Sequence, residues 1–354
     1  MTSTKTLNNQ IKWFDPNDTL SHGCLYNFIV GDRGGGKTFN TLKFLINRFL
    51  KHGEQFIYVR RTVEEIKDAI PTLFHYLQHE GYFLDHELVA TKKALVIDKK
   101  VMGYPRALST SMTRKSLALP KVKWILFEEF MVDGVSSRYL GSGSQEVFMF
   151  NNLYETINRT REPGDEVRVI FLANAFSTVN IYFTYYGVKL PLTPPYKRYN
   201  RYRKDVLVVI WHEDTYVQAK AQTRHYRMNE GTDFNRHAYG NEFYLDTSTF
   251  IKEKDKSAEF HFAMVYMKNT YTIWVNWDKG VYYVTSKGGN LSPKNTFSLT
   301  LEDNAPNNIN IRRVKALPFM KTFRNAVDEN NVYYNDLKTQ ASMKEAIFML
   351  KTTR

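Results

Sequence analysis

The sequence predicts an α/β protein with a mostly parallel sheet around a phosphate-binding loop, followed by a smaller α+β domain. Two observations carry this prediction. An apolar run at 28–30 breaks into the glycine-rich segment 31–38, and a helical apolar pattern follows over 39–50. Further along, residues 260–285 form three short alternating runs separated by tight turns, as in an antiparallel meander. The 354 residues suffice for two domains, since one domain takes roughly 100–200 residues.

The segment 31–38 satisfies the pattern G-x-x-x-x-G-K-[ST] of a phosphate loop. Its backbone N–H groups are expected to close on the phosphates of a nucleotide, with Lys37 reaching the β- and γ-oxygens and Thr38 binding Mg²⁺. The nucleotide-binding residues predicted in this way are Gly31, Asp32, Arg33, Gly34, Gly35, Gly36, Lys37 and Thr38. A glycine-rich turn can also be only a flexible loop, but a strand and a helix flank this one, as the motif requires. We therefore expect ATP and Mg²⁺ as ligands.

The next elements extend the sheet. Residues 55–59 predict a second strand, and a strand, a helix and a strand in this order indicate a right-handed βαβ unit and a parallel sheet. We expect a helix over 63–78 with a break at Pro71, and then a hairpin over 87–98.

Two carboxylates follow the next apolar strand, 122–127. In a parallel sheet this strand end lies at the same edge as the phosphate loop, which is the arrangement of a Walker B strand. Glu128 is therefore predicted to hold Mg²⁺, directly or through water, and Glu129 to orient and deprotonate the attacking water. Two glutamates at a strand end are also common as a solvated end, but their position downstream of a complete phosphate loop favours the functional interpretation.

A helix is expected over 145–160, ending near two arginines, Arg159 and Arg161, and a Pro-Gly break. The strand 167–173 follows and closes on Asn174. This asparagine either senses the γ-phosphate of a bound nucleotide or is a satisfied residue of a turn, and the sequence leaves both alternatives open.

The composition changes at residue 187. We predict a basic linker subdomain over 187–240, between an N-terminal domain at 1–186 and a C-terminal domain at 241–354, because 187–238 carries three prolines and ten Lys and Arg against five Asp and Glu. Within it, 196–204 interleaves five cations with three tyrosines. Sequence-independent contact with nucleic-acid phosphates and an ordinary solvated basic loop both fit this stretch.

Composition narrows the partners. Lys and Arg number 49 against 36 Asp and Glu, and the formal charge of +13 favours a polyanion such as nucleic acid. An acidic membrane surface is the alternative, although no apolar run reaches the roughly 18 residues of a span and the polar N-terminus does not resemble a signal peptide. We therefore expect an intracellular protein. The single cysteine, Cys24, excludes internal disulfides. In the polar arm at 1–20, Trp13 and Phe14 are either packing anchors or a wall for the adenine.

Five segments together resemble a known family. They are the phosphate loop, Gly53-Glu54-Gln55-Phe56-Ile57-Tyr58-Val59-Arg60-Arg61, Glu128-Glu129-Phe130, Arg159-Thr160-Arg161-Glu162 and Leu172-Ala173-Asn174-Ala175. Collinear over nearly the whole chain, the sequence resembles the DNA encapsidation ATPase of the phi-29-like small tailed phages. The resemblance implies an additional-strand, RecA-like (ASCE) ATPase domain joined by a linker to a vestigial RNase H-like nuclease domain. It also implies a homomeric ring, a pentamer, that pumps double-stranded DNA through the phage portal, or connector, into a procapsid.

Further residue roles are implied by the resemblance alone. By position, Arg33 resembles an arginine that couples nucleotide state to closure, Arg161 a trans-acting arginine finger, and Lys115 a second trans-acting basic residue. Glu128 departs from the family pattern, which has Asp there, so direct and water-mediated contact with Mg²⁺ both stay open. The C-terminal domain shows no spaced set of strand-end carboxylates for two metals, so we expect no nuclease activity.

We expect DNA to be held through its phosphates, in keeping with the basic charge. The candidate residues are Arg114 and Lys115 in one loop, and Lys197, Arg198, Arg201 and Arg203 in the linker stretch. We rank the linker stretch higher for DNA, and Lys115 higher for communication between subunits.

The sequence thus predicts a DNA-stimulated ATPase that translocates DNA, found in the host cytoplasm and transiently at the portal vertex. A P-loop helicase, a nucleotide kinase and a non-catalytic, nucleotide-gated DNA-binding ring are the alternatives. The basic charge and second domain disfavour the kinase, and the presence of Lys37, Thr38 and Glu129 disfavours the non-catalytic ring. Whether a packaging RNA takes part is left open.

Overall fold

The chain forms two compact units. The computed structural model describes residues 11–113, 119–132, 139–140, 143–159, 161–178, 180–191, 196–232, 235, 249–311 and 318–352. The first unit consists of Met1–Leu140, Gln145–Phe176 and Thr193–Tyr244, and the second of Gly141–Ser144, Ser177–Leu192 and Leu245–Arg354. Within the residues that the structure describes, no helix is long and apolar enough to cross a membrane.

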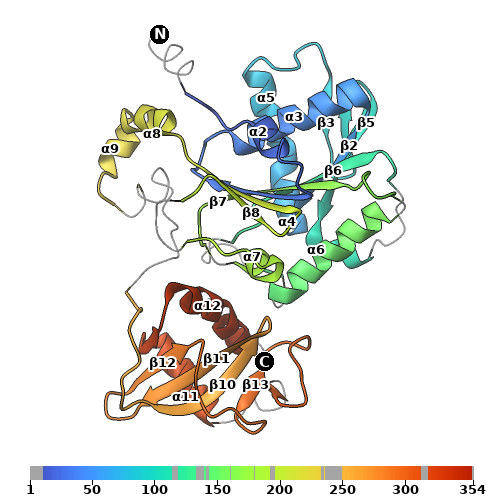
Figure 1. Ribbon diagram of the computed structural model, residues 1–354. Helices are drawn as coiled ribbons and strands as arrows, with labels where there is room; N and C mark the ends of the chain where they lie inside the picture. Colours follow the sequence, from blue (N-terminus) through green and yellow to red (C-terminus); the bar gives the residue numbers. More distant parts are fainter. Residues whose placement is uncertain are drawn as a thin grey trace. The chain divides into compact units, whose positions relative to one another are not determined.

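A nine-stranded sheet forms the centre of the first unit, in the order β3-β4-β5-β2-β6-β7-β1-β9-β8 (Figure 1). Its strands are β1 (Tyr26–Gly31), β2 (Gln55–Arg60), β3 (Leu88–Ala90), β4 (Leu95–Ile97), β5 (Lys100–Ala107), β6 (Val122–Glu128), β7 (Arg168–Asn174), β8 (Tyr199–Tyr202) and β9 (Val206–Trp211). Neighbours from β5 to β9 pair in parallel, whereas β3, β4 and β8 run antiparallel to their neighbours. The predictions of a mostly parallel sheet and of the hairpin are therefore confirmed.

The register of the parallel strands decides which residues meet. Strand β1 lies between β7 and β9, and Gly31 is aligned with both Asn174 and Trp211. In the next pair along the sheet, Glu128 of β6 is aligned with Leu172 of β7. The carboxyl ends of these strands thus form one edge, where the loop after β1 lies beside the residues that follow β6, β7 and β9.

Helices cover both faces of this sheet (Figure 1). The helices of the first unit are α2 (Pro16–Leu20), α3 (Lys37–His52), α4 (Val63–Ala69), α5 (His75–His79), α6 (Gly143–Asn158), α8 (Asp214–Ala221) and α9 (Arg224–Met228), with 3₁₀ turns at Ile70–Thr72 and Leu108–Thr113. Leu45 of α3 and Ile66 of α4 belong to the core on one face. On the other face Phe150 of α6 packs at 4.8 Å from the ring of Phe171. The predicted break at Pro71 is confirmed, since this residue lies in the first 3₁₀ turn.

The structure corrects the prediction of a linker subdomain over 187–240. Strands β8 and β9 belong to the large sheet, because β9, whose residues Val206–Trp211 are buried, pairs with β1, and β8 pairs with β9. The segment Ser177–Leu192, with helix α7 (Ile181–Tyr186), groups with the second unit instead. The stretch 205–211 is strand-like in sequence, but the locally basic composition around it concealed that this strand belongs to the large sheet.

The second unit is a six-stranded sheet in the order β14-β13-β10-β11-β12-β15, with helices against it (Figure 1). Its strands are β10 (Glu259–Tyr266), β11 (Asn269–Asn276), β12 (Val281–Thr285), β13 (Thr296–Ser298), β14 (Ile309–Asn310) and β15 (Val332–Tyr334), and its further helices are α11 (Pro318–Asp328) and α12 (Leu337–Thr352). Strands β10 to β12 are the predicted meander. Phe323 of α11 and Met343 of α12 join Phe262 and Ile273 in one core. The three short parallel strands were not predicted.

Candidate active site

The predicted phosphate loop connects β1 to α3. Helix α3 begins at Lys37, and its N-cap Gly36 has a φ of 84°, a left-handed conformation that glycine adopts without strain. The first turn of α3 contains no acidic residue. Its unpaired N–H groups and the positive end of its dipole therefore suit an anion such as a phosphate.

Lys37 is buried at the base of this loop. Its Nζ donates to the carbonyl oxygens of Gly31 at 3.0 Å and Asp32 at 2.6 Å, and it lies 3.4 Å from Oδ1 of Asn174. Burial lowers the pKa of Lys37 to about 8, and the charge of Asp32 partly opposes this shift. The structure thus brings Asn174 to the lysine of the loop, where strand register would place it.

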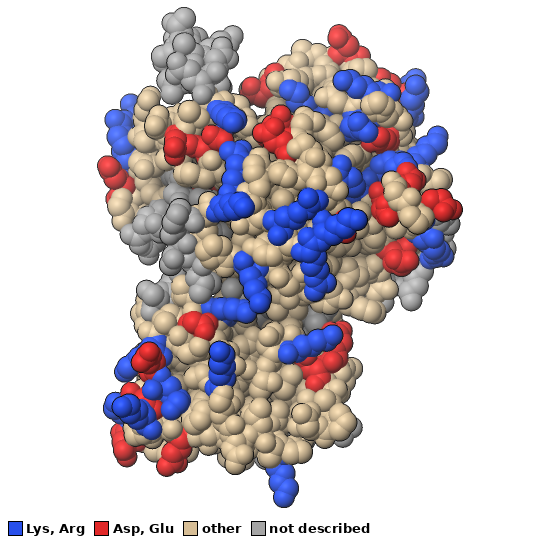
Figure 2. Space-filling view, in the orientation of Figure 1, with Lys and Arg blue, Asp and Glu red and all other residues tan. Residues whose placement is uncertain are grey.

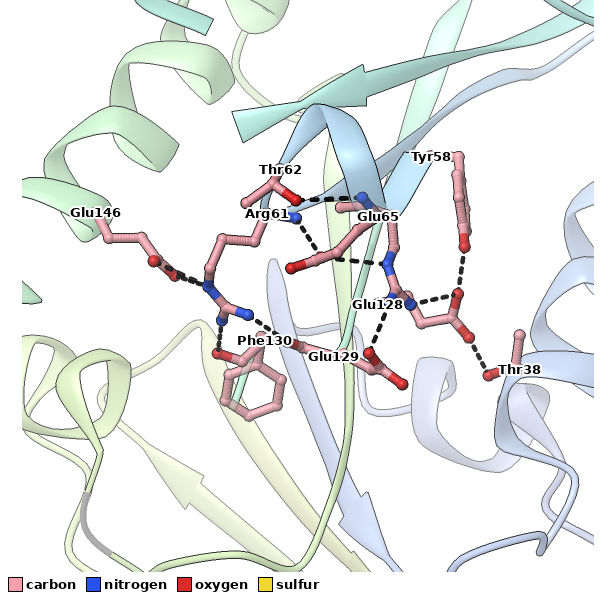
Figure 3. Close-up of polar contacts among 10 residues, drawn as sticks. Thr38, Tyr58, Arg61, Thr62, Glu65, Glu128, Glu129, Phe130 and Glu146 are labelled. Carbon is pink, nitrogen blue, oxygen red and sulfur yellow. Dashed lines mark hydrogen bonds and ion pairs between the residues drawn. The ribbon is translucent and has the colours of Figure 1, made fainter. Parts of the chain in front are cut away.

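Glu128 connects the loop to the sheet. Figure 3 shows its carboxylate between two hydroxyl donors, Thr38 on one oxygen and Tyr58 on the other. Burial and then the charge of Glu128 raise the pKa of Tyr58 well above its ordinary value, so this hydroxyl keeps its proton and donates. Hydroxyl and carboxylate oxygens are the ligands that Mg²⁺ prefers, and Thr38 and Glu128 together therefore fit this ion.

Arg60, the last residue of β2, lies between the carboxylates of Glu128, at the end of β6, and Glu129, which follows it. Its guanidinium is 2.6 Å from Oε2 of Glu129, 3.3 Å from Oε2 of Glu128 and 3.4 Å from Oε2 of Glu65. Burial disfavours its charge, but the groups around it, Tyr58 and then Glu129 and Glu128, raise its pKa overall. The side chain of Glu129 is 60 % exposed. Glu129 is thus oriented by an arginine while its carboxylate stays open to solvent.

A buried ion pair fixes the turn after β6 (Figure 3). Nε of Arg61 lies 3.0 and 3.2 Å from the two carboxylate oxygens of Glu146, and both side chains are almost completely buried. The same guanidinium donates to the carbonyl oxygens of Glu129 at 3.2 Å and Phe130 at 2.8 Å. Glu129 has a φ of 56°, in the left-handed region. Arg61 therefore holds the backbone in a conformation that non-glycine residues seldom adopt.

Sequence reasoning gave no role to Tyr58, Arg60, Arg61 or Glu146. A signal existed for the arginines, because they directly follow a buried strand that is parallel to β6 and so end at the same edge. For Glu146 there was no such signal, since it lies in the first turn of a helix with many polar residues.

The structure describes some of the remaining predicted residues and leaves others outside its described ranges. Arg33 is exposed at the tip of the loop, where its carbonyl oxygen accepts from the hydroxyl of Tyr216. Arg114 and Lys115 lie outside the described residues. Phe14 is buried, and its N–H donates to the carbonyl of Gly35 at 3.2 Å. It is therefore a packing anchor for the loop.

Arg161 lies at the opposite edge of the sheet. Its side chain is 4 % exposed and 3.1 Å from Asp165, and its Nη2 donates to the carbonyls of Pro120 at 3.0 Å and of Val122. Val122 is the first residue of β6, so this arginine closes the amino-terminal end of the strand that delivers Glu128. The predicted role as a trans-acting finger stays a proposal, although the guanidinium of Arg161 is bonded within its own subunit in this structure.

We expect Arg161→Ala to lower the free energy of unfolding by about 1–3 kcal/mol, since it removes the donor to the partly buried carbonyl of Val122. Arg159→Ala is the matched control, because Arg159 is exposed, and exposed substitutions usually change stability by less than about 0.5 kcal/mol. Chemical denaturation of both variants measures the difference. An Arg161→Ala protein of unchanged stability that recovers activity when mixed with Glu129→Gln protein would instead support the trans-acting role.

The structure divides the predicted DNA-binding stretch. Arg198, near the edge of the sheet that carries the phosphate loop, pairs with Glu213 at 2.6 Å. Arg201 and Arg203 lie towards the other end of the β8–β9 hairpin, where Arg201 donates to the carbonyl of His22 at 3.1 Å. Lys197, Arg201 and Arg203 are exposed. The cations are therefore spread along an edge strand and do not form a single cluster.

Comparisons with known proteins identify relatives of this chain. The family model described as Podovirus DNA encapsidation protein (Gp16) matches residues 8–352. The DNA packaging protein of Bacillus phage phi29 is 34% identical over 333 residues, covering 91% of this chain and 96% of that protein. The DNA packaging protein of Bacillus phage B103 is 36% identical over 284 residues, covering 80% of this chain and 84% of that protein.

Solved structures are similar as well. A chain of the bacteriophage Phi-29 viral genome packaging motor assembly superimposes with a TM-score of 0.68 at 32% identity, covering 96% of this chain and 99% of that chain. The N-terminal domain of the DNA packaging ATPase from bacteriophage phi29 superimposes with a TM-score of 0.50 at 38% identity, covering 57% of this chain and 97% of that domain. Because the family model spans nearly all of the sequence and the phi29 protein shares a third of its residues, this chain belongs to the Podovirus DNA encapsidation protein (Gp16) family.

Proposed function

We propose that this protein hydrolyses ATP to drive double-stranded DNA through a phage portal into a procapsid. One observation carries the proposal: the loop lysine Lys37, the Thr38–Glu128 pair and the solvent-open Glu129 lie at one edge of a parallel sheet. That combination supplies the parts of an ATP-hydrolysing site. Family membership supports DNA packaging as the process that this hydrolysis drives, since the relatives are DNA packaging proteins and one solved relative is part of a genome packaging motor assembly.

The phosphate loop and α3 bind ATP. Backbone N–H groups of the loop and of the α3 N-terminus surround the phosphates, and Lys37 donates to the β- and γ-oxygens. Phosphate oxygens then replace the carbonyls of Gly31 and Asp32 as its acceptors. Phosphate charge also opposes the effect of burial, so Lys37 remains protonated near neutral pH.

Thr38 and Glu128 are the residues that would hold Mg²⁺. A bound Mg²⁺ neutralises part of the charge on the phosphates and polarises them. Tyr58 keeps the Glu128 carboxylate in place from the other side. The longer side chain, compared with Asp, allows the carboxylate to reach the hydroxyl of Thr38.

Hydrolysis requires a water aligned with the γ-phosphate and a base to take its proton. Glu129 is exposed to solvent and lies at the right edge of the sheet for this role. The guanidinium of Arg60, 2.6 Å from Oε2 of Glu129, orients its carboxylate. Asn174, beside Lys37, is suited to contact the γ-phosphate from the neighbouring strand. Arg33, exposed at the loop tip, is proposed to respond to the nucleotide state.

DNA contact is proposed for the edge of the first unit. On the face drawn in Figure 2, Lys and Arg side chains gather over the part of this unit where β8 and β9 lie in Figure 1. Contacts of this kind are made to phosphates and carry no sequence information, as a genome pump requires.

The remaining expectations stay proposals. They are a ring of identical subunits, a pentamer, that contacts the portal of a procapsid in the host cytoplasm, the optional use of a packaging RNA, stimulation of the ATPase by DNA, and the lack of nuclease activity. Lys115 stays a proposed trans-acting residue.

The decisive experiment measures ATP hydrolysis with and without duplex DNA, together with strand displacement on a forked duplex. The proposal expects hydrolysis that duplex DNA accelerates, with no separation of the strands. Strand separation would establish a helicase, and hydrolysis indifferent to DNA would remove the translocase.

Serine at Lys197, Arg201 and Arg203 together is expected to weaken duplex binding. The slope of log affinity against log salt should flatten by about 0.9 for each phosphate that the protein no longer neutralises. Arg198 is left unchanged, because its guanidinium forms an ion pair with Glu213.

The matched control removes the same charge elsewhere on this sheet. Lys92, Lys93 and Lys100 are exposed around the β3–β5 edge, and serine at all three should leave the salt slope intact. Equal slopes for the two triple variants would mean that DNA is held elsewhere.

A further inference from the structure

The phosphate loop contains a carboxylate, which an anion site does not favour. Asp32 follows the first glycine of the loop, and its side chain is completely buried. Next to the charged phosphates of a nucleotide, this carboxylate would repel the ligand that the loop has to bind. The structure turns it towards β9, where Oδ2 of Asp32 lies 2.8 Å from Nδ1 of His212.

His212 belongs to a short segment that touches most of the loop. We call Trp211, His212 and Tyr216 the loop brace. A Cβ atom built on Gly35 would lie 1.9 Å from the Trp211 ring, so the indole lies directly against the backbone there. The hydroxyl of Tyr216 donates to the carbonyl of Arg33. The brace therefore contacts the loop on both sides of the glycine that follows Arg33.

Three contacts fix the loop brace and the residue next to it in place. Trp211 is the last residue of β9, which is paired in register with β1. Glu213, directly after His212, pairs with Arg198 of the basic hairpin at 2.6 Å. Trp13 packs edge-on against Tyr216 with ring centroids 5.9 Å apart. A segment fixed in this way can impose one conformation on the loop beside it.

We propose that His212 is a positioning residue for ATP binding, which holds the Asp32 carboxylate away from the phosphates while Trp211 and Tyr216 fix the loop around it. This inference rests on the proposed function, because it concerns ATP in the same loop. Without His212 the carboxylate either stays buried without this partner or turns towards the phosphates. Both outcomes weaken the binding of ATP more than they affect the catalytic step.

The charge of His212 strengthens the contact. Its hydrogen bond to Asp32 raises the pKa of His212, burial opposes the shift, and the carboxylates of Asp32, Asp214 and Glu213 add to it. Lys37, bonded to the carbonyl of Asp32, is the cation that faces the pair from the loop. A raised pKa means that the contribution of the charged histidine is fully present below its ordinary pKa of about 6.5 and is lost as the pH rises through the folded-state value.

His212→Ala should raise the KM for ATP about tenfold, the effect of losing one charge-assisted hydrogen bond, and leave kcat within about twofold. His212→Asn keeps a neutral N–H donor near the position of Nδ1 and should recover part of the affinity. The KM of His212→Asn divided by that of the unmodified protein should fall towards one as the pH rises, because only the unmodified protein loses a charged histidine. Any effect of Lys37 on the KM is common to both proteins.

The sharpest test removes the carboxylate. If His212 acts by holding Asp32, then Asp32→Asn combined with His212→Ala should have a lower KM than His212→Ala alone. A double variant as impaired as the single one would overturn the proposal. Gln218→Ala is the control, since Gln218 is exposed on α8, the helix that follows His212 and contains Tyr216.

Two further measurements separate the possible failures. Circular dichroism and thermal unfolding establish that each variant is folded, and Tyr216→Phe, which keeps the buried ring, tests the brace with the smallest change. Lys37→Ala reports on the proposed function itself. If Lys37→Ala weakens ATP binding while His212→Ala does not, only the positioning role is wrong. If neither weakens it, the site does not bind ATP.

Discussion

Glu129→Gln is expected to lower kcat for ATP hydrolysis by about 10²–10⁴-fold, the range typical of losing a general base. The carboxamide has nearly the same shape as the carboxylate but does not accept a proton from water. Neither the loop nor the Thr38–Glu128 pair is altered, so ATP binding should stay close to that of the unmodified protein. Steady-state hydrolysis and equilibrium binding of ATP together measure the two effects.

Lys37→Ala provides the contrast. This change removes the donor to the β- and γ-phosphates, so both binding and turnover should fall. Glu129→Gln protein is thus expected to retain ATP that Lys37→Ala protein does not bind. Hydrolysis by Glu129→Gln at the unmodified rate would show that the carboxylate after β6 is not the base.

Arg61→Ala is expected to lower the free energy of unfolding of the first unit by about 3–5 kcal/mol, as is typical when one partner of a buried ion pair is removed. The change leaves Glu146 buried at 0 % exposure without its guanidinium. It also removes the donor to the carbonyls of Glu129 and Phe130. Chemical denaturation followed by tryptophan fluorescence measures the loss.

A double variant separates the ion pair from the rest of the loss. Arg61→Met with Glu146→Leu removes both charges while keeping apolar volume, so it should be more stable than Arg61→Met alone. ATP hydrolysis should stay impaired in both, because neither keeps the two hydrogen bonds that hold the turn at Glu129. A destabilisation below about 1 kcal/mol for Arg61→Met would contradict the interpretation, since breaking a buried pair normally costs several times more.

The fold of the first unit was predictable where the sequence pattern is local. The glycine-rich loop, the run 122–127 and the pair Glu128-Glu129 carry their signal within a few residues, and parallel strands then bring them to one edge. The stretch 205–211 was recognisable as a strand, but its place in the large sheet was missed because its neighbours on both sides are polar and basic. Its burial becomes visible only from the pairing with β1.

Contacts between distant segments account for the rest of the site. Arg61 meets a glutamate 85 residues away, and His212 meets an aspartate 180 residues away. No spacing rule links such residues, because only the folded sheet brings them together. Arg161 shows the converse, since a resemblance in sequence suggested its role but did not indicate that the folded chain buries its side chain at the other edge of the sheet.

At Glu129 the left-handed backbone and the need for a carboxylate favour different residues. A non-glycine residue held in a sparsely populated backbone region costs roughly 1–3 kcal/mol, and glycine would adopt the same turn more easily. The residue that folds best at this position is therefore one without a carboxylate. Selection for heat resistance alone would lead away from glutamate here, so a thermostable variant of this protein has to gain its stability at other positions.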